Sequence, residues 1–223
     1  MNISKLYLHI GLPKTGTSAL EQFFYENRER LLEEGLFYPR TGLDGWAQHH
    51  FPASINGLNF KTESTLPELL EGITAEPDFN PQHAVLLSSE AFHNLRQGQD
   101  MEKLREALKG VDVKIIVYLR RQDYWVQSAY NQSVKSHRRR LTESIGKFME
   151  KRRFNKILDY PRFLSKWEKS FGSSNGSSNI IVKVYEKEQM PQGVFQDFMD
   201  IFSITIDETF RVPEGNINPS LSP

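Results

Sequence analysis

The residues best suited to chemistry lie near the N-terminus, between Leu6 and Leu20. An apolar run leads there into a loop that begins at Gly11, has its second glycine at Gly16, and is followed at once by hydroxyl side chains. A strand, a glycine-containing loop and a helix start, in this order, allow backbone N–H groups and the helix dipole to hold a phosphate. We therefore predict an anion-binding loop at this position.

The lysine of this loop is displaced from its position in nucleotide triphosphatases. Their phosphate-binding pattern, G-x-x-x-x-G-K-[S/T], has the lysine directly after the second glycine. Thr17 stands there in this chain, whereas Lys14 lies two residues before Gly16. The displacement indicates a phosphate ligand other than ATP with magnesium.

A second pair of residues indicates a second phosphate site. Arg120 follows an apolar run that reads as a strand, and Ser128 lies eight residues later in a predicted helix. At a rise of about 1.5 Å per residue, Ser128 is about two turns into that helix. A guanidinium offers a planar fork to a phosphate, and a hydroxyl adds one hydrogen bond. Two such sites predict a ligand with phosphates at two ends.

The elements that must position these residues alternate between strands and helices. Strands are expected at Lys5–Ile10, Ala84–Ser89, Val113–Leu119 and Ile180–Tyr185; helices are expected from Ser18 to a cap at Gly35 and at 65–73, 100–109, 122–136, 162–171 and 195–202; a long loop is expected over 41–61. This rhythm implies a mostly parallel sheet, with ligands bound at the carboxyl ends of its strands. The expected fold class is α/β: one domain over residues 1–223, a parallel sheet flanked by helices as in P-loop nucleotide kinases.

Composition narrows the possible functions. The chain of 223 residues has 28 basic and 28 acidic residues and no cysteine. Balanced charge makes nucleic acid a poor partner, and the missing cysteines exclude disulfides, thiol catalysis and cysteine metal sites. No stretch approaches the ~18 apolar residues of a membrane span, and Met1 leads straight into the first strand without room for a signal peptide. We expect a cytoplasmic protein, and the oligomeric state stays open.

The two motifs together resemble the cytosolic and bacterial sulfotransferases, which use 3'-phosphoadenosine 5'-phosphosulfate as donor. Pro13–Ser18, read as PKTGTS, resembles the loop that holds the 5'-phosphosulfate in that family. Arg120 and Ser128 match its 3'-phosphate motif, and Tyr185 stands where the family often has a tyrosine near the adenine. The resemblance spans about residues 5 to 205 and leaves the long loops unmatched.

The resemblance implies roles for individual residues. It assigns the donor nucleotide to Pro13, Lys14, Thr15, Gly16, Thr17, Ser18, Arg120, Ser128 and Tyr185. Lys14 would reach the oxygen that bridges sulfur and the 5'-phosphate and would stabilise the charge that develops there. Because a sulfuryl group carries less charge than a terminal phosphoryl group, no metal is expected.

The reaction needs a base to take the proton of the acceptor. Glu90, after the second strand, is the first choice, and His93 is the runner-up. Carbohydrate sulfotransferases commonly use a glutamate, whereas those that act on phenols and steroids use a histidine. The resemblance thus implies a small-molecule or glycan acceptor, a carbohydrate or another hydroxylated metabolite, sulfated on a hydroxyl or an amine. We expect its pocket in loops 41–61, with His49 and His50, and 137–156.

The sequence departs from the family pattern at two places. The usual Arg-Asn-Pro is Arg120-Arg121-Gln122 here, so Arg121 can duplicate or alter the grip on the 3'-phosphate. Residues 216–223 lack the closing helix that family members use, so we expect the C-terminal element to be missing or truncated. The basic run His137–Arg140 is either a solvated face or an attractor for an anionic acceptor or for the phosphates of the cofactor.

Two other functions remain open. A P-loop kinase for a small molecule would share the fold but would need ATP and magnesium, and the displaced lysine and the lack of clear metal carboxylates argue against it. A catalytically inactive sulfotransferase-like binding protein would keep Arg120 and Ser128 without turnover.

Overall fold

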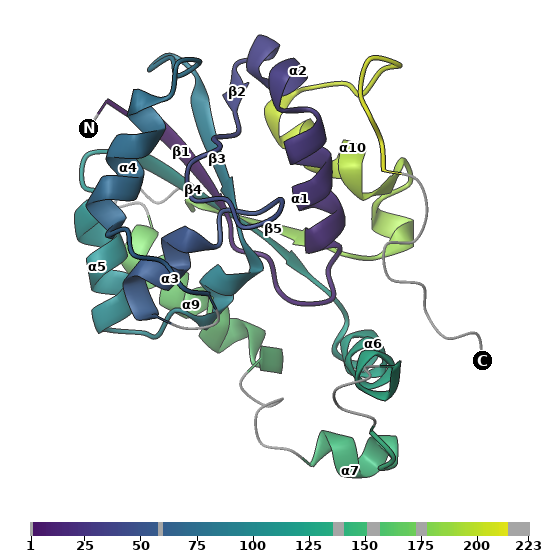
Figure 1. The fold of residues 1–223 in the computed structure, drawn as a ribbon. Coiled ribbons are helices and arrows are strands. Elements are labelled where there is room, and N and C mark those ends of the chain that lie inside the picture. Colours follow the sequence, from purple (N-terminus) through teal and green to yellow (C-terminus); the bar gives the residue numbers. More distant parts are fainter. Residues whose placement is uncertain (1, 58–59, 136–140, 151–156, 173–177, 214–223) are drawn as a thin grey trace.

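The computed structural model describes residues 2–57, 60–135, 141–150, 157–172 and 178–213 and contains one sheet with strand order β2-β3-β1-β4-β5 (Figure 1). The strands are β1 (Lys5–His9), β2 (Leu36–Phe37), β3 (Ala84–Ser88), β4 (Asp112–Leu119) and β5 (Ile180–Val184). Every neighbouring pair is parallel. The prediction of an α/β fold with a parallel sheet flanked by helices is confirmed.

Strand β1 lies at the centre of the sheet, paired with β3 on one side and β4 on the other. Leu8 is in register with Leu87 of β3 and with Ile115 of β4. The carboxyl ends of these three strands therefore adjoin, and they lead into the Gly11 loop, Glu90 and Arg120.

Helices cover both faces of the sheet (Figure 1). One face carries α3 (His50–Asn56), α4 (Leu66–Ala75), α5 (Gln99–Ala107) and α9 (Tyr160–Phe171); the other carries α1 (Thr17–Glu26), α2 (Arg28–Glu33) and α10 (Gly193–Met199). Short 3-10 helices are η1 (Glu90–Asn94), η2 (Lys187–Gln189) and η3 (Asp200–Phe202). The helices α6 (Gln122–Lys135) and α7 (Ile145–Met149) project away from one end of the sheet.

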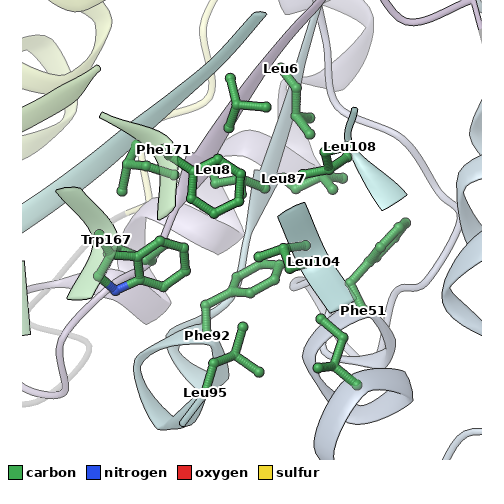
Figure 2. Packing of buried hydrophobic residues seen from close by; sticks show 14 of the residues in the cluster. Leu6, Leu8, Phe51, Leu87, Phe92, Leu95, Leu104, Leu108, Trp167 and Phe171 are labelled. Carbon is green, nitrogen blue, oxygen red and sulfur yellow. The ribbon is translucent and has the colours of Figure 1, made fainter. Parts of the chain in front are cut away.

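The core has one layer on each side of the sheet because successive strand side chains point to opposite faces. Leu6, Leu8 and Leu87 pack with Phe92 and Trp167 on one side (Figure 2). On the other side, the buried partners are Tyr7, Leu20, Phe23, Phe24, Leu86, Ile116 and Phe198. Burial on both faces explains why the central strands read as continuous apolar runs.

Two expected elements differ from the observed ones. The helix expected from Ser18 to Gly35 is divided at Asn27, whose amide donates to Arg211 O at 2.8 Å and accepts from Arg211 N at 2.7 Å. The expectation of an irregular loop over 41–61 is wrong for its middle, which forms α3. Phe51 and Ile55 of α3 are buried in the core, so tertiary packing stabilises this short helix.

Candidate active site

The loop between β1 and α1 has a backbone that restricts its residue types. Lys14 has φ 73° and Gly16 has φ 75°, so two of its residues lie in the left-handed region. A Cβ atom at position 11 would lie 2.4 Å from Thr17 Oγ1, and one at position 16 would lie 2.7 Å from Cε2 of Tyr185. A non-glycine residue with positive φ is often found at a functional site, and Lys14 is the predicted catalytic lysine.

Threonine side chains brace the loop from inside. Thr15 Oγ1 donates to Leu12 O at 2.6 Å, and Thr17 Oγ1 donates to the same oxygen at 3.3 Å. Gly16 is the N-cap of α1 and provides no side-chain cap, and the first turn of α1 has no acidic residue. The first N–H groups of this helix are therefore suited to an anion, with Ser18 exposed beside them.

Residues from distant parts of the chain meet this loop. Arg120 Nη1 donates to Lys14 O at 3.1 Å, and Trp125 Nε1 of α6 donates to Pro13 O at 2.6 Å. The Arg120 guanidinium also lies 5.7 Å from the ring centroid of Tyr185, which packs on Gly16. The structure thus brings the predicted residues of β1, β4 and β5 together at one edge of the sheet.

The other two residues of the predicted 3'-phosphate site lie on or next to α6. Ser128 is one turn after Trp125, so it lies on the same side of the helix as the side chain that reaches the loop. Arg121 forms an ion pair with Asp123 at 2.7 Å and stacks over Tyr124 at 4.4 Å. Arg121 is thus engaged on the exposed surface of this helix start.

Glu90 begins η1 directly after the carboxyl end of β3. Burial raises the pKa of Glu90, and the positive charge of Lys14 acts in the opposite direction. This coupling shows that the two predicted catalytic side chains lie within electrostatic reach of each other. A carboxylate and an ammonium group at the same strand ends can serve a proton transfer and a developing negative charge, respectively.

His93, the alternative base, lies in the same 3-10 turn as Glu90. Its Nδ1 donates to Glu90 O, and burial lowers the pKa of its imidazole. Lys166 of α9 donates to His93 O at 3.2 Å and to Leu95 O at 2.7 Å, and burial lowers the pKa of Lys166 to about 8. These contacts give His93 and Lys166 a part in fixing the turn that carries Glu90.

Three buried polar residues that sequence reasoning missed lie next to Glu90. Glu21 of α1 is 4% exposed, and burial together with the charge of Glu90 raises its pKa well above the usual value. Ser88 Oγ donates to Glu21 Oε1 at 3.4 Å and is 2.8 Å from His9 Nδ1. Burial lowers the pKa of His9 to about 3, so this imidazole is neutral. The spacing of Thr17, Glu21 and Phe24 on one helical stripe was the available signal for a buried glutamate.

The segment before α3 is bonded to the end of β3. Gln48 accepts from Ser88 N at 2.9 Å through Oε1, and its own N–H donates to Ser88 O at 3.0 Å. His49 Nδ1 lies 2.7 Å from Ser89 Oγ, and its ring stacks on Phe60 with centroids 4.0 Å apart. Part of the loop expected to form the acceptor pocket therefore lies beside Glu90.

Some predicted features belong to parts of the chain that the structure does not describe. The basic run over 137–140, part of the loop at 137–156 and the last residues, 214–223, lie outside the described residues.

Within the described ranges, no group of three or more histidine or acidic side chains is arranged to hold a metal ion. In the same ranges, no helix has the length and apolar character that a membrane crossing requires.

Comparisons with known proteins support the fold. No family model matches this sequence. An uncharacterized protein from Archaeoglobus fulgidus is 39% identical over 139 residues, which cover 62% of this chain and 35% of that protein. The crystal structure of mouse sulfotransferase SULT7A1 complexed with PAP matches with a TM-score of 0.50 and 13% identity over 94% of this chain. This chain has the fold of a sulfotransferase.

The matches also differ from this chain in length. It spans about a third of the Archaeoglobus protein and 61% of the mouse chain. At 13% identity, the likeness to the mouse enzyme concerns the fold, and the chemistry has to be argued from the residues of this site.

Proposed function

We propose that this protein transfers a sulfuryl group from 3'-phosphoadenosine 5'-phosphosulfate to a hydroxyl or amine of a small acceptor. The observation that carries the proposal is that Lys14 and Glu90 follow the carboxyl ends of β1 and β3, where the charge of Lys14 acts on the pKa of Glu90, next to a helix start without a side-chain cap. In this proposal, Lys14 stabilises the charge that develops on the leaving oxygen, and Glu90 is the general base.

The residues of the site suit such a donor. The first N–H groups of α1 and the side chain of Lys14 supply positive potential for the 5' end. Arg120 and Ser128 are assigned to the 3'-phosphate. The aromatic ring of Tyr185 is assigned to the adenine of the donor. The mouse neighbour was solved with PAP, which is 3',5'-adenosine bisphosphate, the expected product of this reaction.

The proposed step is an in-line displacement at sulfur without a metal. Glu90 takes the proton of the acceptor group as its oxygen or nitrogen forms a bond to sulfur. The bond from sulfur to the 5'-phosphate oxygen breaks, and Lys14 stabilises the charge left on that oxygen. The products are the sulfated acceptor, which we propose to be a carbohydrate or another hydroxylated metabolite, and 3',5'-adenosine bisphosphate. A cytoplasmic location stays a prediction.

Calorimetric titration with 3',5'-adenosine bisphosphate tests the donor half of this proposal. We expect binding of equal strength with and without EDTA, and weaker binding of ATP with magnesium. Arg120→Ala should weaken bisphosphate binding by at least about tenfold, because it removes charged hydrogen bonds of about 1.5–3 kcal/mol. Absence of binding, or binding that requires magnesium, would overturn the proposal in favour of a binding protein of another kind or a kinase.

A further inference from the structure

The histidine before α3 is held more firmly than a loop residue needs to be. Hydrogen bonding to Ser89 fixes the Nδ1 side of the His49 ring, and parallel stacking on Phe60, with an interplanar angle of 10°, fixes its plane. Ser89 directly precedes Glu90, so the His49 imidazole is anchored one residue away from the proposed base. A locked side chain beside the reacting group is typical of a binding residue.

The hydrogen bonds around Ser89 are compatible with a proton on Nε2 of this ring. Ser89 Oγ accepts the N–H of Ala91 at 3.2 Å, and its own O–H can donate to Nδ1 of His49, which lies 2.7 Å away. Burial lowers the pKa of His49 and keeps the imidazole neutral, despite the opposing charge of Asp44. A neutral imidazole that accepts at Nδ1 carries its proton on Nε2.

The other nitrogen of the ring remains available. Among the described residues, Nε2 of His49 has no hydrogen-bond partner, and it is not one of the buried polar atoms closed off from solvent. In the tautomer with the proton on Nε2, this nitrogen is a donor of fixed orientation next to the proposed base, and it is suited to an oxygen of a bound molecule.

We propose that His49 is an acceptor-binding residue whose Nε2–H donates to a second oxygen of the acceptor while Glu90 faces the reacting hydroxyl. The inference rests on the proposed sulfuryl transfer and narrows its acceptor class. A site with these two groups favours molecules with an oxygen close to the reacting hydroxyl, as in sugars, over molecules with a single hydroxyl. In such a molecule, the hydrogen bond to His49 also orients the reacting group toward the donor.

The test measures transfer of ³⁵S from the labelled donor to p-nitrophenyl β-glycosides of glucose, galactose and N-acetylglucosamine, with 2-(4-nitrophenyl)ethanol as the single-hydroxyl probe. For the wild type, we expect kcat/KM to be at least about tenfold higher for one of the glycosides. His49→Asn keeps a polar group near the Nδ1 position, and His49→Gln keeps one near the Nε2 position. His49→Asn should therefore raise the KM for the glycoside about tenfold, and His49→Gln should raise it less than about threefold.

The control histidine is His83, which is partly buried and precedes the amino end of β3, at the opposite edge of the sheet. His83→Ala should leave the KM for the glycoside within about twofold of wild type, and neither His49 variant should change the KM for the donor or bisphosphate binding.

Three results would count against this inference. They are equal losses in His49→Asn and His49→Gln, a preference for the single-hydroxyl probe, and bisphosphate binding without transfer to any glycoside; in the last case the donor half of the proposed function stands. If the bisphosphate itself does not bind, the proposed function fails and this inference fails with it.

Discussion

The Gly11–Ser18 loop and helix α6 would grip opposite ends of the same donor, but they are held in different ways. Leu12 O accepts two threonine hydroxyls inside the loop, and Arg120 and Trp125 donate to the carbonyls of Lys14 and Pro13 from outside. The loop also lies between the buried strand β1 and helix α1.

Helix α6 is anchored mainly at its first turns. Beyond them it projects from the sheet and packs on α7, where Trp125, Val126 and Phe148 form a small core of their own (Figure 1). Tyr130 OH donates to Glu143 O at 2.9 Å and adds a second contact to the segment before α7. The comparison indicates that the proposed 5' site is preorganised and that the proposed 3' site depends in part on a peripheral pair of helices. Substitutions in the loop should therefore have the larger effects.

The largest expected effect belongs to Lys14. Lys14→Met should lower kcat by about 10²–10³ because it removes the charge that is proposed to stabilise the leaving oxygen. It should also shift the acidic limb of the kcat/KM profile to higher pH: the Glu90 carboxylate is the active form, burial raises its pKa, and the charge of Lys14 normally lowers it. The exposed Lys109, paired with Glu106, gives the control Lys109→Met, which should change neither quantity. An unchanged acidic limb in Lys14→Met would show that the charge of Lys14 does not affect the pKa of Glu90.

The next largest effect is expected for Gly16→Ala, which should lower the melting temperature. The left-handed backbone costs an alanine about 1–2 kcal/mol, and its Cβ would also overlap the Tyr185 ring. Gly110 has φ 85° with nothing within 4 Å of an added Cβ, so Gly110→Ala reports the backbone cost alone. We expect melting temperatures about 2–6 °C lower for Gly110→Ala and clearly lower still for Gly16→Ala. Equal shifts would show that Tyr185 does not restrict this loop.

The connection between the two regions is expected to contribute less. Trp125→Phe keeps the packing against Phe148 but removes the hydrogen bond to Pro13 O, which is worth about 0.5–1.5 kcal/mol. Bisphosphate binding, measured by calorimetry, should weaken by about two- to tenfold as the loop loses this brace. Trp46→Phe, at an exposed tryptophan, should leave it unchanged. Tight binding by Trp125→Phe would indicate that the loop keeps its shape without α6.

The smallest effect is expected for Ser128→Ala. Its hydroxyl is assigned one neutral hydrogen bond to the 3'-phosphate, so bisphosphate binding should weaken by no more than about tenfold and the melting temperature should not change. Adenosine 5'-monophosphate lacks that phosphate and serves as the control ligand, with equal affinity for the variant and the wild type. If both ligands lose affinity alike, Ser128 supports the helix and does not contact the 3'-phosphate.

The sequence was informative wherever local chemistry decides the structure. Buried parallel strands need continuous apolar runs, so β1, β3 and β4 were predicted within a residue or two. Gly11, Gly16 and Lys14 were singled out because a glycine-containing turn with a lysine at a strand-to-helix junction is suited to a phosphate, and phosphate binding there stays a prediction. The position of Arg120 at a strand end followed from the same rule, and the structure places it against the loop. The roles of Ser128, Tyr185 and the acceptor stay predictions.

Contacts between distant residues decided the rest. Asn27 ends α1 because Arg211, far along the chain, satisfies its amide, and α3 forms where Phe51 and Ile55 find a core to enter. No local pattern reports such partners, since they exist only after the chain has folded.

The proposed site likewise has features that the sequence shows and features that exist only after the chain has folded. The sequence by itself determined the glycine-containing loop between the first strand and the first helix, the charge at Lys14 and a glutamate at the end of the second predicted strand. Only the tertiary structure decided that Glu90 shares the field of Lys14, that Glu21, Ser88 and His9 are buried beside it, and that His49 is fixed next to it by Ser89. Parallel strands bring their carboxyl ends to one edge whatever their separation in sequence, and burial then sets the protonation of the groups that meet there.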